Sequence, residues 1–173
     1  MHIVDIHRRH ADLRARLTDV HSRATLSDNS ASIPPDHTAA AIELMHDVAI
    51  LHDPSIVTHL NLAAQLSVAL AHELKMTAEE IETLAQAARI YDIGKVSIPQ
   101  RILESRSPAG SADRVSIEAH ALAGAKLLAA RETPVMRAAT VIAQTHHERY
   151  DGTGYPRKLR ASQIPVFGRI VAV

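Results

Sequence analysis

The sequence predicts an all-α fold, a helical bundle of about five to seven helices. Apolar residues recur with helical spacing along most of the chain, and no alternating apolar and polar pattern indicates a strand. Only four residues are aromatic, so Ala, Leu, Ile and Val must pack the core, which suits close contacts between helices. Short polar segments containing Gly or Pro separate the helical stretches.

The chain divides into a short N-terminal part and a main domain. Residues from about 5 to 24 carry mixed charges and a thin apolar stripe, which predicts an exposed or partner-binding helix. The polar segment 27–35 ends in two prolines and has the composition of a linker. We therefore expect an N-terminal helix and linker over residues 1–35 and a helical domain over residues 36–173.

Five helices of the main domain can be placed from their start and stop signals. Asp53-Pro54 and Thr133-Pro134 have the form of a cap followed by a first-turn proline. The segment Thr77–Glu80 has the form of a capping box. Residues 150–156 are rich in turn-forming residues and must form a loop. The predicted helices cover about residues 37–52, 53–74, 77–91, 112–130 and 133–147, and Gly94 should end the third.

Composition excludes several classes of function. The formal net charge is zero and no long face carries one sign of charge, which gives no support for nucleic-acid binding or attraction to a membrane surface. There is no apolar run long enough to span a bilayer and no signal-peptide pattern, so we expect a cytoplasmic protein. The chain has no cysteine and twelve histidines, so any metal site must consist of imidazole and carboxylate groups.

The last ten residues, 164–173, have the pattern of an opening apolar helix. They stop without a glycine, a basic last turn or a polar tail. We therefore expect the native chain to continue past Val173, which would make the domain incomplete at this end.

The strongest chemical signal is the pair His146-His147, which is followed by Glu148 and a glycine-containing loop over residues 149–156. Two histidines at the end of a helix can both turn toward one site, and neutral imidazole is a common ligand for first-row metals. A pair of surface histidines would have the same pattern, but the loop that follows favours a site.

Weaker signals occur earlier in the chain. Asp92 follows the third predicted helix, where a carboxylate faces the negative end of the helix dipole unless Lys95 or a metal compensates. His59 and His120 each lie on a helix of mostly small or apolar residues. Taken singly, such residues are more often packed, hydrogen-bonded histidines and an ordinary helix end, so their convergence on one site is an expectation.

Taken in order, these segments resemble the HD-GYP family of metal-dependent phosphohydrolases, from about residue 54 to the end. The resemblance is carried by His59, Asp92-Ile93-Gly94-Lys95, Ile98-Pro99, Ile102-Leu103, Glu118-Ala119-His120, Gly124, His146-His147-Glu148 and Asp151-Gly152-Thr153-Gly154-Tyr155-Pro156. It implies a helical bundle of the HD-domain type that holds iron or manganese ions and hydrolyses cyclic di-GMP or a related nucleotide. Metal ions in such a site activate water and stabilise charge on the phosphoryl oxygens.

The resemblance also implies a role for each candidate residue. Asp92 is similar to a carboxylate that bridges two ions, and Lys95 is expected to contact a phosphate or the leaving oxygen. We treat these two residues as catalytic. The remaining ligands of one ion would be His120, His146 and His147, and the loop beside the substrate would be Gly154, Tyr155 and Pro156.

The second ion position departs from the family pattern. It would use His59 and a share of Asp92, but Tyr91 stands where the family has a histidine ligand. Ser55 stands where a three-metal branch has a carboxylate, and the last aspartate ligand would follow Val173. Neutral phenol is a poor ligand for manganese or iron(II). We therefore expect the chain to hold at most one ion tightly.

Three functions are compatible with these observations. The chain can be a cyclic di-GMP phosphodiesterase, impaired or not by Tyr91. It can be a degenerate, non-catalytic domain that works as a signalling or protein-interaction module, with the N-terminal helix as a contact for a homodimer or a signalling partner. It can also be a fragment that folds poorly and has no function.

Overall fold

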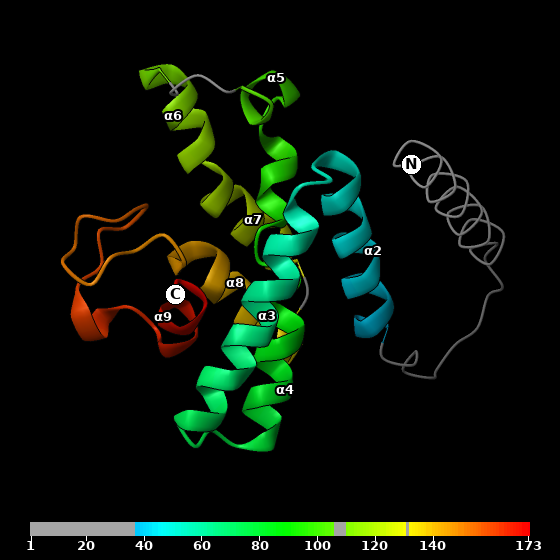
Figure 1. The fold of residues 1–173 in the computed structure, drawn as a ribbon, viewed down its shortest axis with the longest axis vertical. Coiled ribbons are helices and arrows are strands. Elements are labelled where there is room, and N and C mark those ends of the chain that lie inside the picture. The colour runs from blue at the N-terminus through cyan, green and yellow to red at the C-terminus, as the bar shows by residue number, and fades with distance from the viewer. Residues whose placement is uncertain (1–36, 106–109, 131) are drawn as a thin grey trace, which may run out of the picture. The chain divides into compact units, whose positions relative to one another are not determined.

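The computed structural model describes residues 37–105, 110–130 and 132–173, and within them every regular element is helical, as Figure 1 shows. The all-α prediction is therefore confirmed for this part of the chain. The predicted N-terminal helix and linker lie outside the described residues. In chain order the elements are α2 (Thr38–His52), α3 (Ile56–Glu73), α4 (Ala78–Ala87), the 3-10 helix η1 (Ile93–Ser97), α5 (Gln100–Leu103), α6 (Ser111–Glu118), α7 (His120–Leu128), α8 (Pro134–Thr145), the 3-10 helix η2 (Ala161–Gln163) and α9 (Val166–Val171).

Helix α8 lies at the centre of the packing and contacts α4, α7 and α9. Its buried face includes Ala139, Ile142 and Ala143, none of which is exposed to solvent. The small alanines allow neighbouring helices to approach closely, and larger side chains such as Leu84 and Leu128 fill the remaining space. None of the described helices is both long enough and apolar enough to cross a bilayer.

Two of the predicted helix starts are confirmed. Thr77 forms a full capping box with Glu80 at the start of α4. The side chain of Thr133 accepts a hydrogen bond from the backbone N–H of Met136, with Pro134 in the first turn of α8. Helix α3, in contrast, begins later than predicted.

The start of α3 shifts because Asp53 forms a turn before the helix. Its Oδ1 accepts hydrogen bonds from the backbone N–H and the hydroxyl of Ser55, at 3.0 and 2.6 Å. Ser55 is therefore the residue that precedes the first helical residue, Ile56. The prediction of Asp53 as the helix cap was wrong.

Two further helices end earlier than their sequence pattern predicts. Helix α4 ends at Ala87, and bonds of the 3-10 type, such as Ile90 N–H to Ala87 C=O at 3.2 Å, lead the chain onward to η1. Asp92 therefore precedes η1 and does not cap an α-helix. The predicted helix over residues 112–130 is interrupted at Ala119, where Nδ1 of His120 hydrogen-bonds the carbonyl of Ile117.

Gly94 and Gly124 bring η1 directly against α7. A Cβ atom at Gly94 would lie 2.0 Å from the carbonyl oxygen of His120 and 2.5 Å from the backbone nitrogen of Gly124, so only glycine fits at this contact. This backbone contact places Asp92, two residues before Gly94, beside the first turn of α7.

Candidate metal centre

Three histidines from two helices form a cluster in the bundle. His120 is the first residue of α7, and His146 and His147 directly follow α8. Their imidazole ligand atoms lie within 4.8 Å of one another. His120 and His146 are buried and His147 is half-buried, so solvent competes little for their ring nitrogens. The geometry is that of a group that could hold one cation.

Backbone carbonyl groups fix the orientation of the two buried rings. Nδ1 of His146 donates to the carbonyls of Ile142 and Ala143, at 3.0 and 3.1 Å, and Nδ1 of His120 donates to Ile117. In a neutral imidazole the proton is then on Nδ1, and the lone pair of Nε2 is free. The two Nε2 atoms are 3.3 Å apart, so two lone pairs face each other.

The carboxylate of Asp92 completes this arrangement. Its Oδ1 is 3.2 Å from Nε2 of His120 and 3.6 Å from Nε2 of His146, and it is buried without a hydrogen-bond partner among the described residues. When both imidazoles are neutral, three electron-pair donors face a common point. Ligands at roughly 2.1 Å from one ion, separated by roughly 90–110°, would lie roughly 3.0–3.4 Å apart. The residues present fit a divalent ion.

The other carboxylate oxygen of Asp92 belongs to a different contact. Oδ2 is 2.7 Å from the ammonium group of Lys95. Burial alone would raise the pKa of the Asp92 carboxyl, but its contacts with His120 and His146 and the charge of Lys95 outweigh burial and hold this pKa well below its usual range. Asp92 is therefore ionised at neutral pH and can act as a ligand.

Tyr91 and His59 form a hydrogen-bonded pair on the far side of Asp92. The phenol oxygen lies 2.7 Å from Nε2 of His59, and the same nitrogen is 3.8 Å from Oδ2 of Asp92. Burial and the charge of Asp92 raise the pKa of Tyr91, so its hydroxyl stays protonated. The ligand nitrogen of His59 is thus occupied by a hydroxyl group, and the His59 side chain is 58% exposed.

The loop after α8 is tied to the cluster through Tyr155. Its ring stacks on His147, with centroids 4.6 Å apart and planes 21° from parallel, and its N–H donates to the carbonyl of His147. The peptide bond between Tyr155 and Pro156 is cis. Gly154 is required here, because a Cβ atom would lie 2.4–2.6 Å from backbone atoms of Arg149, His147 and Glu148.

Glu148 is buried and holds the loop through hydrogen bonds to its backbone. It is 5% exposed, and its carboxylate accepts hydrogen bonds from the backbone N–H groups of Arg157 and Leu159, at 2.7 and 2.9 Å. These two bonds satisfy both carboxylate oxygens. In this structure Glu148 therefore positions the segment 157–159 and is not directed at the histidine cluster.

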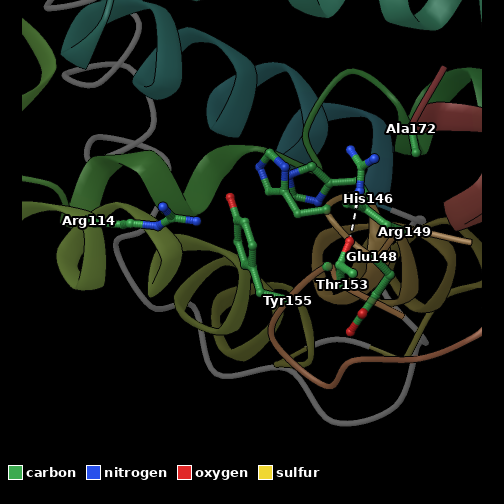
Figure 2. Close-up of a pocket in the computed structure, with 9 residues that line it drawn as sticks. Arg114, His146, Glu148, Arg149, Thr153, Tyr155 and Ala172 are labelled. Atoms are coloured by element: carbon green, nitrogen blue, oxygen red, sulfur yellow. Dashed lines mark hydrogen bonds between the residues drawn. The ribbon is translucent and has the colours of Figure 1, made fainter. Parts of the chain in front are cut away.

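A pocket of about 330 Å³ opens beside the cluster. Figure 2 shows Tyr155 in the middle of this pocket, with Arg114 on one side and His146 and Arg149 on the other. His147 and Gly154 also line it. The pocket gives a ligand access to the half-buried edge of the cluster.

The structure brings together most of the residues that the sequence singles out. His120, His146, His147, Asp92 and Lys95 are neighbours, and the loop Gly154-Tyr155-Pro156 lies beside them. His59 reaches Asp92 only at 3.8 Å and is paired with Tyr91. Sequence reasoning missed that pair, the loop contacts of Glu148 and the position of Arg114. The one available signal for the Tyr91–His59 pair was the tyrosine directly before Asp92. Nothing in the sequence pointed to Arg114.

A search of protein families matches residues 43–173, more than half of the chain, to the HD domain. The chain belongs to the HD-domain family. Its relatives include a cyclic di-GMP phosphodiesterase of Thermotoga maritima, 33% identical over 138 residues, a match that covers 80% of this chain and 38% of the relative. The cyclic di-GMP phosphodiesterase response regulator RpfG of Xanthomonas campestris is 35% identical over 103 residues, a match that covers 60% of this chain and 27% of the relative.

A third relative of this HD domain is the 3'3'-cGAMP-specific phosphodiesterase 2 of Vibrio cholerae, 33% identical over 115 residues. That match covers 66% of the chain and 22% of the relative. The chain thus spans less than two fifths of the length of each of these relatives. The resemblance to the HD-GYP phosphohydrolases is confirmed by these matches, and its implications for activity are taken up below.

Proposed function

We propose that this HD domain binds one divalent ion, iron or manganese, through His120, His146, His147 and Asp92, and that it acts as a phosphodiesterase on cyclic di-GMP or a related cyclic dinucleotide. The observation that carries the proposal is the triangle formed by Nε2 of His120, Nε2 of His146 and Oδ1 of Asp92, with sides of 3.2, 3.3 and 3.6 Å. The substrate class is supported by the names of the relatives.

The residues around the ion would divide the work. A bound divalent ion lowers the pKa of water and stabilises the charge that develops on phosphoryl oxygens. The carbonyl groups at Ile117, Ile142 and Ala143 hold the rings of His120 and His146 in the ligating tautomer.

Lys95 would keep Asp92 ionised and oriented through their 2.7 Å contact. Its ammonium group is partly exposed, with 26% of the side chain accessible to solvent, so it can also donate to a phosphate oxygen.

A second tightly bound ion is disfavoured by the groups that fill its position. Oδ2 of Asp92 is paired with Lys95, and Nε2 of His59 is hydrogen-bonded to the neutral phenol of Tyr91. An ion here would have to displace an ammonium group and a hydroxyl group while gaining few ligands. Loss of one ion of a two-ion site removes several kcal/mol of transition-state stabilisation. We therefore expect this chain to hydrolyse its substrate more slowly than an enzyme with two ions, by a factor on the order of 10² or more.

The Tyr91–His59 pair also favours a second candidate function, a domain that binds a cyclic dinucleotide without hydrolysing it and passes the signal to a partner. The cytoplasmic location and the partner contact of the N-terminal segment, both predicted from the sequence, stay predictions.

Replacing Tyr91 by histidine tests the proposal. We expect the unaltered chain to contain about one iron or manganese ion after purification, and Tyr91→His to contain about two and to hydrolyse cyclic di-GMP faster, because the new imidazole supplies one of the ligands that the second position lacks, beside His59. Metal analysis and chromatography of the reaction products measure both quantities.

The matched control is Tyr91→Phe, which removes the hydroxyl group from His59 without adding a ligand. We expect its ion content to equal that of the unaltered chain. Two tightly held ions in the unaltered chain, or no gain of metal in Tyr91→His, would contradict the one-ion proposal. Tight binding of cyclic di-GMP without hydrolysis in either protein would favour the non-catalytic function.

A further inference from the structure

Arg114 of α6 forms a positively charged wall of the pocket beside the cluster. Figure 2 shows its guanidinium group directed toward the hydroxyl of Tyr155. The Nε of Arg114 donates to Oε1 of Glu118 at 2.8 Å, which fixes the direction of the guanidinium plane. Among the described residues no hydrogen-bond partner engages the terminal amino groups of Arg114, so both can bind a ligand.

The groups that line the pocket favour an anion. Arg149 on the opposite wall is anchored in the same way as Arg114, through a hydrogen bond from its Nε to Thr153 Oγ1 at 3.1 Å. The one carboxylate in the lining, Glu148, is buried and already accepts two backbone hydrogen bonds. The hydroxyl of Tyr155 adds a hydrogen-bond donor to the same pocket.

We propose that Arg114 is a specificity-determining residue that binds the second phosphate of a cyclic dinucleotide while the first phosphate lies at the histidine cluster. This inference rests on the proposed function and adds to it the reason for selecting a ligand with two phosphates. The planar guanidinium group can donate two parallel hydrogen bonds to one phosphate. A ligand with a single phosphodiester group would reach the cluster without using Arg114.

The test compares the affinity of the manganese-loaded chain, residues 1–173, for two ligands by calorimetric titration. For cyclic di-GMP, we expect Arg114→Gln to bind about 10- to 100-fold more weakly, the usual effect of losing a charge-assisted hydrogen bond. Arg114→Lys should recover part of this loss, because it keeps the charge and loses the paired donors. For bis(4-nitrophenyl) phosphate, which has one phosphodiester group, Arg114→Gln should bind within about twofold of the unaltered chain.

Arg101 provides a matched control. Its side chain is 75% exposed, as is that of Arg114, and it also pairs with a carboxylate, Asp113 at 3.6 Å, but it does not line the pocket. Arg101→Gln should change neither affinity by more than about twofold.

Three outcomes would overturn the inference. Equal affinity of Arg114→Gln and the unaltered chain for cyclic di-GMP would overturn the role of Arg114 alone and leave the proposed function intact. An equal loss for both ligands would mean that Arg114 acts on the cluster or on folding. Failure of the unaltered chain to bind cyclic di-GMP would overturn the proposed function together with this inference.

Discussion

The two carboxylate oxygens of Asp92 have different partners, and this difference divides the site. Oδ1 faces the nitrogens of His120 and His146, whereas Oδ2 is neutralised by Lys95. A ligand position with free electron pairs therefore lies next to a position that already contains a positive charge. This asymmetry, together with the neutral phenol of Tyr91, is the residue-level basis for expecting a single ion.

His147 and Asp92 predict how the stability of the ion-free protein responds to acid. The pKa of His147 is lowered from 6.5 to about 3, first by burial and then by repulsion from His146 and His120. Between about pH 6.5 and pH 3 the unfolded chain therefore binds more protons than the folded one, so stability falls as the pH falls through this window. The lowered pKa of Asp92 acts in the same direction at still lower pH.

Melting temperatures of the chelator-treated protein between pH 7 and pH 4 measure this effect. We expect a steady decrease toward pH 4, and a smaller decrease in His147→Asn, which cannot take up the proton at this position. A melting temperature that does not change with pH, or an equal decrease in both proteins, would show that His147 is not held neutral by its surroundings.

The contact between η1 and α7 determines whether Asp92 reaches the histidines at all. Its two glycines leave different amounts of room: a Cβ at Gly94 would lie 2.0 Å from a backbone oxygen, whereas a Cβ at Gly124 would be 3.1 Å or more from its neighbours. We expect Gly94→Ala to cost about 1–3 kcal/mol or more of unfolding free energy and to weaken manganese binding, since η1 must move away from α7. Gly124→Ala should cost less.

Gly110→Ala is the control for these substitutions, because no atom lies within 4 Å of a Cβ built there and its backbone φ of −62° suits alanine. Urea unfolding and manganese titration measure both effects, and Gly110→Ala should lose less than about 1 kcal/mol and no metal affinity. Wild-type metal binding by Gly94→Ala would contradict the role of the close contact.

Elements with local signals could be predicted from the sequence, and elements set by distant contacts could not. The capping box at Thr77 and the Thr133-Pro134 start of α8 depend on neighbouring residues, and both were confirmed. The break at Ala119 lies directly before His120, whose ring turns back to bond the carbonyl of Ile117 while its other nitrogen faces the cluster. Helical periodicity contains no information on such a break.

The site itself was predicted in the same partial way. The residue types and their order located the ligand candidates, because imidazole and carboxylate groups at helix ends are unusual enough to notice. The pairing of Tyr91 with His59 and the position of Arg114 depend on which side chains meet across helices. Tyr91 and His59 are 32 residues apart in the sequence, which is beyond the reach of local patterns.

The whole bundle acts as a scaffold that positions the ligands of the candidate metal site. Asp92 lies directly before η1, His120 begins α7 and His146 directly follows α8. Helix α7 packs against both η1 and α8, beside a core of small and branched side chains. Because the three donors are buried and aligned by the backbone, little reorganisation is needed when a cation binds.

Anomalous X-ray diffraction from crystals of the manganese-treated chain would locate the cation directly. We predict one strong peak between His120, His146, His147 and Asp92, at roughly 2.0–2.3 Å from the ligating nitrogen and oxygen atoms. No peak at this point, or a peak bound only by other residues, would contradict the metal centre and the functions proposed from it.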